Sequence, residues 1–172
     1  NLPIGLQKRN GLRYGHLSEK SKIAFHHVLS TLFSAQGYLI TTSIMALDDV
    51  LNEVYKEAYE RKMISDEDYK EVRALNWDYG NYFIAIWGKP NAKEPWGLKF
   101  EGHHISINIS IVADKVSITP LFLGTDPAEV TITKYAGLRV LSKEEDYGLL
   151  LINSFNEEQQ QIATLSQDVP ED

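Results

Sequence analysis

The sequence has 172 residues, a formal net charge of −7 and no cysteine. This length predicts a single domain over residues 1–172. The acidic balance argues against nucleic-acid binding, because proteins that grip phosphate backbones carry clustered Lys and Arg. The lack of cysteine excludes disulfides, thiolate metal ligands and cysteine nucleophiles. No apolar run reaches the roughly 20 residues of a membrane-spanning helix, and no signal peptide is visible, so we expect a soluble protein, either cytoplasmic or exported.

The first half of the chain predicts helices. Ser18 is placed to cap a helix that runs to about Ala35 with apolar residues at helical spacing, and Gly37 suits the residue that ends it. A second helix is expected over residues 42–62, where apolar side chains repeat at three and four. Ser65 can cap a third, short helix over residues 66–74.

Beyond residue 80 the pattern predicts strands. Residues 82–87 form a short apolar run between glycines. Residues 100–112 form the clearest strand, because isoleucines alternate with polar residues. Residues 115–123 are expected to pair with it as a hairpin, and Pro120 predicts that this strand lies at an edge or carries a bulge. A further strand is expected over residues 129–133.

Two helices are expected at the end of the chain. Residues 142–145 match a capping box for a helix to about Phe155, and Asn156 can cap a final helix that fades near Ser166. Helices therefore come first, then strands, then helices again. This order predicts an α+β fold in which N-terminal helices pack on a mostly antiparallel sheet and C-terminal helices follow.

One dense polar cluster, Glu101-Gly102-His103-His104, lies in the predicted strand. Side chains alternate along a strand, so Glu101 and His103 share a face and could bind zinc, copper or iron with a third ligand from elsewhere. His104 lies on the other face, where it could act as a general acid or base. In the purely structural alternative, His103 is a hydrogen-bonded histidine at the core edge and His104 lies on a solvated face. Spacing alone leaves these alternatives open.

Two further features suit a small-molecule ligand. Arg139 could clamp a substrate carboxylate, or it could pair with the acidic residues at 144–146. A dense aromatic set could line a pocket, or it could form the core between helices and sheet. The aromatic set comprises Trp77, Tyr79, Tyr82, Phe83, Trp87 and Trp96.

Several ordered motifs resemble the domain of unknown function 3500 family. The motifs that carry the resemblance are Arg9-Asn10-Gly11-Leu12, Ile44-Met45-Ala46-Leu47, Trp96 to His104, Thr119 to Gly124, Pro127 to Val130, and Ala136 to Leu141 followed by Glu144-Glu145-Asp146. The resemblance implies no activity, but it includes both the histidine cluster and Arg139 in the family pattern. It also implies that family members are longer at both ends, so we expect the chain to be a fragment whose site could be completed by residues outside it.

Two functions from different classes follow. In the first, the protein is an enzyme acting on a small molecule, with His103, His104 and Arg139 as catalytic residues and Glu101 and His103 as ligands of a divalent transition metal. In the second, it is a non-catalytic module that binds a ligand or another protein, and its edge strand around Pro120 favours self-association.

Overall fold

The structure, a computed structural model, describes residues 8–168. The chain divides into two compact units, Asn1–Val140 and Leu141–Asp172. The first unit contains the sheet and the helices that precede it, and the second contains the last two helices. The expected single domain over residues 1–172 stays a prediction.

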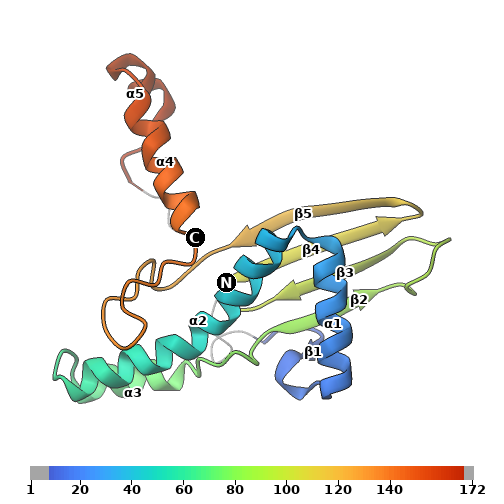
Figure 1. Cartoon of the computed structure of the whole chain (residues 1–172), viewed down its shortest axis with the longest axis horizontal. Coiled ribbons are helices and arrows are strands. Elements are labelled where there is room, and N and C mark those ends of the chain that lie inside the picture. The colour runs from blue at the N-terminus through green and yellow to red at the C-terminus, as the bar shows by residue number, and fades with distance from the viewer. Residues whose placement is uncertain (1–7, 169–172) are drawn as a thin grey trace. The chain divides into compact units, whose positions relative to one another are not determined.

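The first unit is built on a five-stranded antiparallel sheet whose strands lie side by side in chain order (Figure 1). Its strands are β1 (Leu12–Arg13), β2 (Phe83–Trp87), β3 (Trp96–Glu101), β4 (Ile105–Val112) and β5 (Lys115–Leu123). β5 is an edge strand, and its register against β4 shifts between Ile107 and Ile109, opposite the region of Pro120. The expectation of an edge strand or a bulge at Pro120 is therefore confirmed, since proline cannot donate to a ladder.

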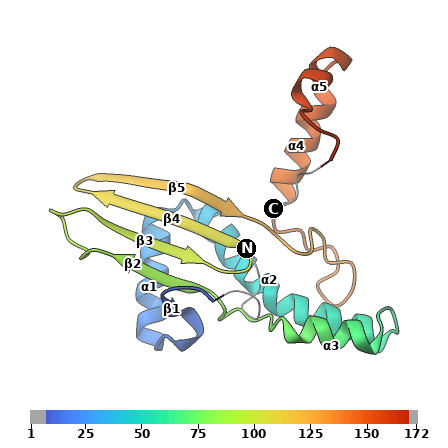
Figure 2. The same cartoon turned by 180° about the vertical axis from the view of Figure 1, so that it is seen from behind.

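Three helices precede most of the sheet: α1 (Glu19–Leu32), α2 (Ala35–Glu60) and α3 (Asp66–Ala74). Helices α1 and α2 lie against the same face of the sheet, in front of it in Figure 1 and behind it in Figure 2. The Phe25 ring of α1 packs on the Phe100 ring of β3 with centroids 4.9 Å apart. One sheet face is therefore covered, and the other is open.

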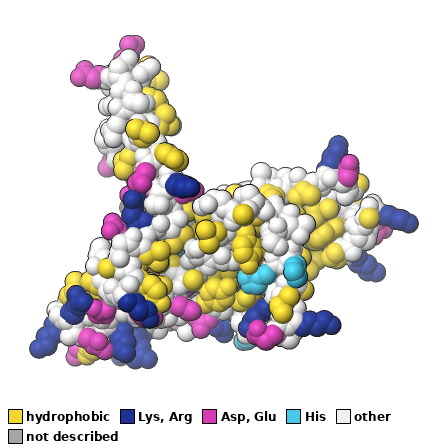
Figure 3. Space-filling view, in the orientation of Figure 1, with side chains coloured by type: hydrophobic (Ala, Val, Ile, Leu, Met, Phe, Trp, Pro, Cys, Tyr) yellow, Lys and Arg dark blue, Asp and Glu magenta, His cyan; other side chains and the backbone are white. Residues whose placement is uncertain are grey.

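Apolar and polar residues alternate along β4 because successive side chains point to the covered face and to the open face of the sheet. Ile105, Ile107 and Ile109 are buried beneath the helices, whereas Ser106 and Asn108 point to the open face. The helices do not cover the whole of this face, because Ile86, Val116 and Leu121 on it stay about half exposed. Figure 3 shows hydrophobic surface over the sheet beside the helices on this side.

The boundary between the first two helices differs from the expectation. Helix α1 ends at Leu32, and Ser34 caps α2 by accepting a hydrogen bond from the Gly37 backbone N–H at 3.1 Å. Gly37 therefore lies in the first turn of α2, and the prediction that it ends the first helix is wrong. The serine cap satisfies a backbone donor that a helix start leaves unpaired.

Two strand predictions are also wrong. The expected strand over residues 100–112 is interrupted at residues 102–104, where the chain turns from β3 into β4. The expected strand over 129–133 is an irregular stretch with bends, anchored by Val130, which packs against Leu47 and Val50 of α2. In both places tertiary packing replaced the extended conformation that local propensity favoured.

The second unit contains α4 (Ser142–Ser154) and α5 (Glu157–Ala163). Asn156 forms the expected cap of α5, a capping box with Gln159. The capping box expected at Ser142 is wrong, because α4 starts one residue earlier, at a Leu141 cap without a side-chain hydrogen bond. Across residues 8–168, no helix combines the length and apolar character needed to cross a membrane. The predicted α+β class, with helices before and after an antiparallel sheet, is confirmed.

Candidate functional site

The site is built on the turn between β3 and β4. Gly102 donates its backbone N–H to the Ile105 carbonyl at 2.9 Å, and its own carbonyl accepts from the Arg9 guanidinium at 3.1 Å. A Cβ on Gly102 would lie 2.3 Å from Cδ1 of the buried Tyr82 ring. The turn therefore depends on glycine because the backbone presses directly against an aromatic side chain.

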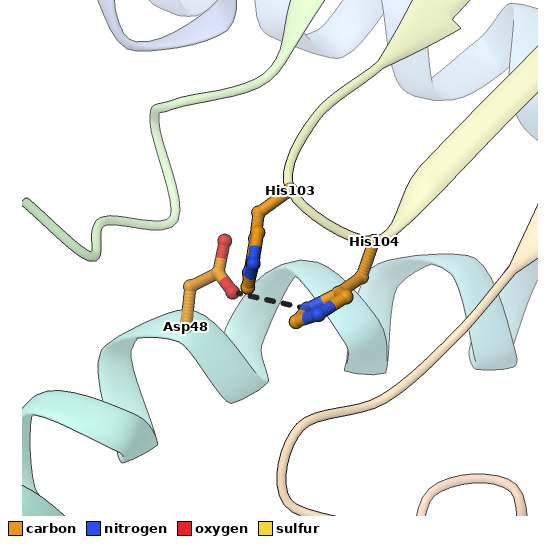
Figure 4. Close-up of side chains that lie close together, drawn as sticks. All are labelled: Asp48, His103 and His104. Carbon is orange, nitrogen blue, oxygen red and sulfur yellow. Dashed lines mark ion pairs between the residues drawn. The ribbon is translucent and has the colours of Figure 1, made fainter. Parts of the chain in front are cut away.

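This turn places two adjacent histidines beside a carboxylate from a distant part of the chain. Figure 4 shows Asp48 on α2 with His103 and His104 from the turn facing it. One ligand atom from each of these three residues lies within 4.8 Å of the other two. The imidazole centroids of His103 and His104 are 3.6 Å apart. The turn removes the strand alternation that would have aimed the two rings to opposite faces.

His103 is held in an environment that keeps it neutral. Its ring lies against Trp77 with centroids 4.4 Å apart. Burial, followed by the nearby His104 and Arg9, lowers the pKa of His103 to about 3. Its Nδ1 is buried and has no hydrogen-bond partner among the described residues. A neutral imidazole with an unsatisfied, buried nitrogen is an arrangement that costs free energy unless something else binds there.

Asp48 is also unusual, because it is 3% exposed in the middle of α2. Its Oδ1 lies 3.8 Å from Nδ1 of His104, a separation too long for a hydrogen bond. Burial raises the pKa of the neighbouring Tyr82 hydroxyl well above its usual value, and the charge of Asp48 and a side-chain hydrogen bond with Asp48 raise it further. A buried carboxylate needs compensating partners, and the Tyr82 hydroxyl and the Arg9 guanidinium already interact with Asp48. At 3.8 Å, Asp48 Oδ1 and His104 Nδ1 could be bridged by an ion or a water.

A small cavity adjoins this group. Its volume is about 10 Å³, enough for roughly one water-sized occupant and no more. The cavity is lined by Asp48, Leu75, Asn76, Trp77, Asp78, Asn81 and His103. Besides His103 Nδ1, the lining residues contribute two more buried polar atoms without a hydrogen-bond partner among the described residues, Trp77 Nε1 and Asn81 Oδ1. The interior at this point is therefore polar and incompletely satisfied.

The structure brings together some of the residues predicted from sequence and separates others. His103 and His104 belong to the group. Glu101 lies on β3 with its carboxylate 2.7 Å from Lys99 Nζ, outside the group. Arg139 lies in the segment that follows β5 along the chain. The roles expected for Glu101 and Arg139 stay predictions.

Asp48 was missed as a site residue, although the sequence carried a signal for it. It follows Ile44 by four residues and precedes Leu51 by three, so it lies on the apolar stripe of its helix. The helix dipole is the other explanation for an acidic residue in a helix, but it acts only within the first turn. Because α2 begins at Ala35, Asp48 is several turns too late for that explanation.

Comparison with known proteins identifies a family but no activity. The sequence profile of the family described as "Protein of unknown function (DUF3500)" matches residues 1–172. No curated protein matches the chain, and no solved structure matches it.

Proposed function

The chain belongs to the DUF3500 family, whose description assigns no activity, and we propose from the geometry of the site that Asp48, His103 and His104 bind a divalent transition-metal ion. The observation that carries this proposal is the convergence of three potential ligand atoms within 4.8 Å of one another. One of these residues, His103, has a buried ring nitrogen without a hydrogen-bond partner among the described residues.

The distances suit an ion of ordinary size. Zinc binds imidazole nitrogen and carboxylate oxygen at about 2.1 Å, so ligand atoms in a tetrahedral site lie about 3.4 Å apart. The 3.8 Å between Asp48 Oδ1 and His104 Nδ1 is close to that value. Small rotations of the side chains would close the remaining gap, and the cavity beside His103 provides the space for them.

The protonation state supports the same proposal. Metal ligation requires neutral imidazole and ionised carboxylate, and the lowered pKa of His103 keeps this ring neutral at physiological pH. An ion would also compensate the charge of the buried Asp48. The site would therefore gain from a cation a further electrostatic partner for Asp48 and a partner for the unsatisfied nitrogen of His103.

The ligand set favours zinc or ferrous iron. Two histidines and one carboxylate leave a coordination position open, as in catalytic zinc sites and non-haem iron oxygenases. An ion in such a site can polarise a substrate oxygen or lower the pKa of bound water. The 10 Å³ cavity is too small for a substrate, so a small molecule would approach from the side of His104, whose side chain is 14% exposed.

Elemental analysis by mass spectrometry tests the proposal. Wild-type protein is loaded separately with zinc and with ferrous iron, desalted and compared with Asp48→Asn and with a His103→Ala, His104→Ala double variant. We expect about one ion per chain in the wild type and at least a tenfold loss of affinity in both variants, because each removes a ligand.

Two matched controls separate ligand loss from general damage. Glu101→Gln removes the carboxylate nearest in sequence to the histidines, and His27→Ala removes an exposed histidine from α1. Both should retain the ion. The proposal would be contradicted if the wild type retains neither zinc nor iron. It would also be contradicted if Asp48→Asn or the double histidine variant binds the ion as well as the wild type.

A further inference from the structure

A second candidate site lies on the open face of the sheet, away from the histidines. It is a groove of about 460 Å³ at the end of the β2–β3 and β4–β5 hairpins. This volume falls within the range of about 300–1,000 Å³ typical of small-molecule sites. The lining residues are Trp87, Gly88, Pro95, Trp96, Gly97, Leu98, Asn108, Ile109, Ser110 and Val112.

Strand register places the floor and walls of this groove. Trp87 pairs with Gly97 across β2 and β3, and Gly97 pairs with Ser110 across β3 and β4, so the three residues form one transverse row. Ser110 alternates with the buried Ile109, so the row lies on the open face, which Figure 2 shows with the helices behind the sheet.

Gly97 creates the space in this row. A Cβ added there would meet only the Ile109 carbonyl oxygen, at 3.2 Å, and no side chain within 4 Å. The Trp87 side chain therefore borders an open floor instead of a neighbouring side chain. Trp87 is 56% exposed, which is unusual for an indole that packs in a core and typical of one available for contact with a ligand.

The polar groups of the groove are neutral. None of the ten lining residues is charged. Ser110 offers a hydroxyl that can donate and accept. The Asn108 side-chain nitrogen donates to the Pro120 carbonyl at 3.0 Å, which fixes the amide, and its oxygen can still accept. The groove thus combines an aromatic face with uncharged hydrogen-bonding groups beside it.

We propose that this groove binds a neutral sugar ring. A pyranose has an apolar face of C–H groups that stacks on an indole and a rim of hydroxyl groups that pair with serine and asparagine side chains. A charged ligand such as a nucleotide would find no countercharge among the lining residues. This is a ligand-binding activity separate from the metal site, and it requires no ion.

Nuclear magnetic resonance titration tests the proposal. Maltose, cellobiose, lactose and N,N′-diacetylchitobiose are added in turn to the isotope-labelled full chain, and the Trp87 indole N–H signal is followed. We expect a saturable shift with at least one of these sugars. Binding should weaken at least tenfold in Trp87→Ala, which removes the stacking surface, and in Gly97→Val, which fills the floor.

Other variants keep the test independent of folding. Ser110→Ala removes only a hydroxyl from an exposed position and should weaken binding severalfold. Phe122→Ala removes an exposed aromatic ring from the same sheet face but outside the groove, and it should bind like the wild type. Asp48→Asn should also bind like the wild type, which separates this site from the metal site.

Three results would overturn the proposal. The first is the absence of a saturable shift with all four sugars. The second is binding that persists unchanged in Trp87→Ala. The third is a Trp87 response to phosphatidylcholine–phosphatidylserine vesicles but not to sugars, which would assign the exposed indole to a membrane surface.

Discussion

Replacing Gly102 with alanine should destabilise the first unit and weaken the candidate metal site together. The added Cβ would lie 2.3 and 2.4 Å from two carbons of the Tyr82 ring, whereas carbon atoms in contact are about 3.5–4.0 Å apart. The turn or the ring must therefore move by more than about 1 Å. Tyr82 is completely buried and packs on Phe100, so the turn that carries His103 and His104 is the part that shifts.

The expected loss of unfolding free energy is about 3 kcal/mol, the upper end of what overpacking in a core usually costs. For a protein of this size, that corresponds to a fall in Tm of roughly 6–12 °C. Urea unfolding followed by circular dichroism gives the free energy of unfolding. Elemental analysis of the metal-loaded protein gives the number of ions bound per chain. The unfolding free energy and the amount of bound ion should both decrease, because the same displacement of the β3–β4 turn disturbs the packing and moves the two histidines.

A double-mutant cycle identifies the cause. In a Tyr82→Leu background the ring is absent, so Gly102→Ala should cost at least 1 kcal/mol less than it does in the wild type. Gly148→Ala is the matched control, since a Cβ there meets nothing within 4 Å and alanine favours a helix interior by up to about 1 kcal/mol. An unchanged stability of Gly102→Ala, or an equal loss in both backgrounds, would refute the reasoning.

Two further predictions concern pH and backbone strain. Because the pKa of His103 is lowered from 6.5 to about 3 in the folded protein, the unfolded state takes up a proton first as pH falls, and unfolding free energy should be lost between about pH 6.5 and 3. In urea unfolding of the metal-free protein, His103→Gln should lose less unfolding free energy over this range than the wild type. An equal loss in both proteins would contradict the lowered pKa of His103. Ala113 lies in the β4–β5 turn with φ 55°, so Ala113→Gly should raise the unfolding free energy by about 1 kcal/mol, and a decrease in Tm would contradict this account.

Several features of the protein were determined by local sequence. Ser18 and Asn156 mark helix starts because a side-chain oxygen satisfies a backbone donor a few residues away. The alternation of isoleucine with polar residues over 105–111 predicts a strand with one buried face, and the structure confirms it. The cluster at 101–104 could be singled out as a dense group of potential ligands.

Other features depended on contacts between distant parts of the chain. The position of the β3–β4 turn depends on Gly102 packing against Tyr82, twenty residues earlier. The approach of Asp48 to the histidines depends on how α2 lies against the sheet. A periodic pattern reports which face of an element is buried, but it does not report what that face meets. The sequence by itself therefore determined the helices, the fold class and the histidine half of the candidate site. Only the tertiary structure decided where the strand breaks and which carboxylate joins the histidines, because these depend on close packing between residues far apart in the chain.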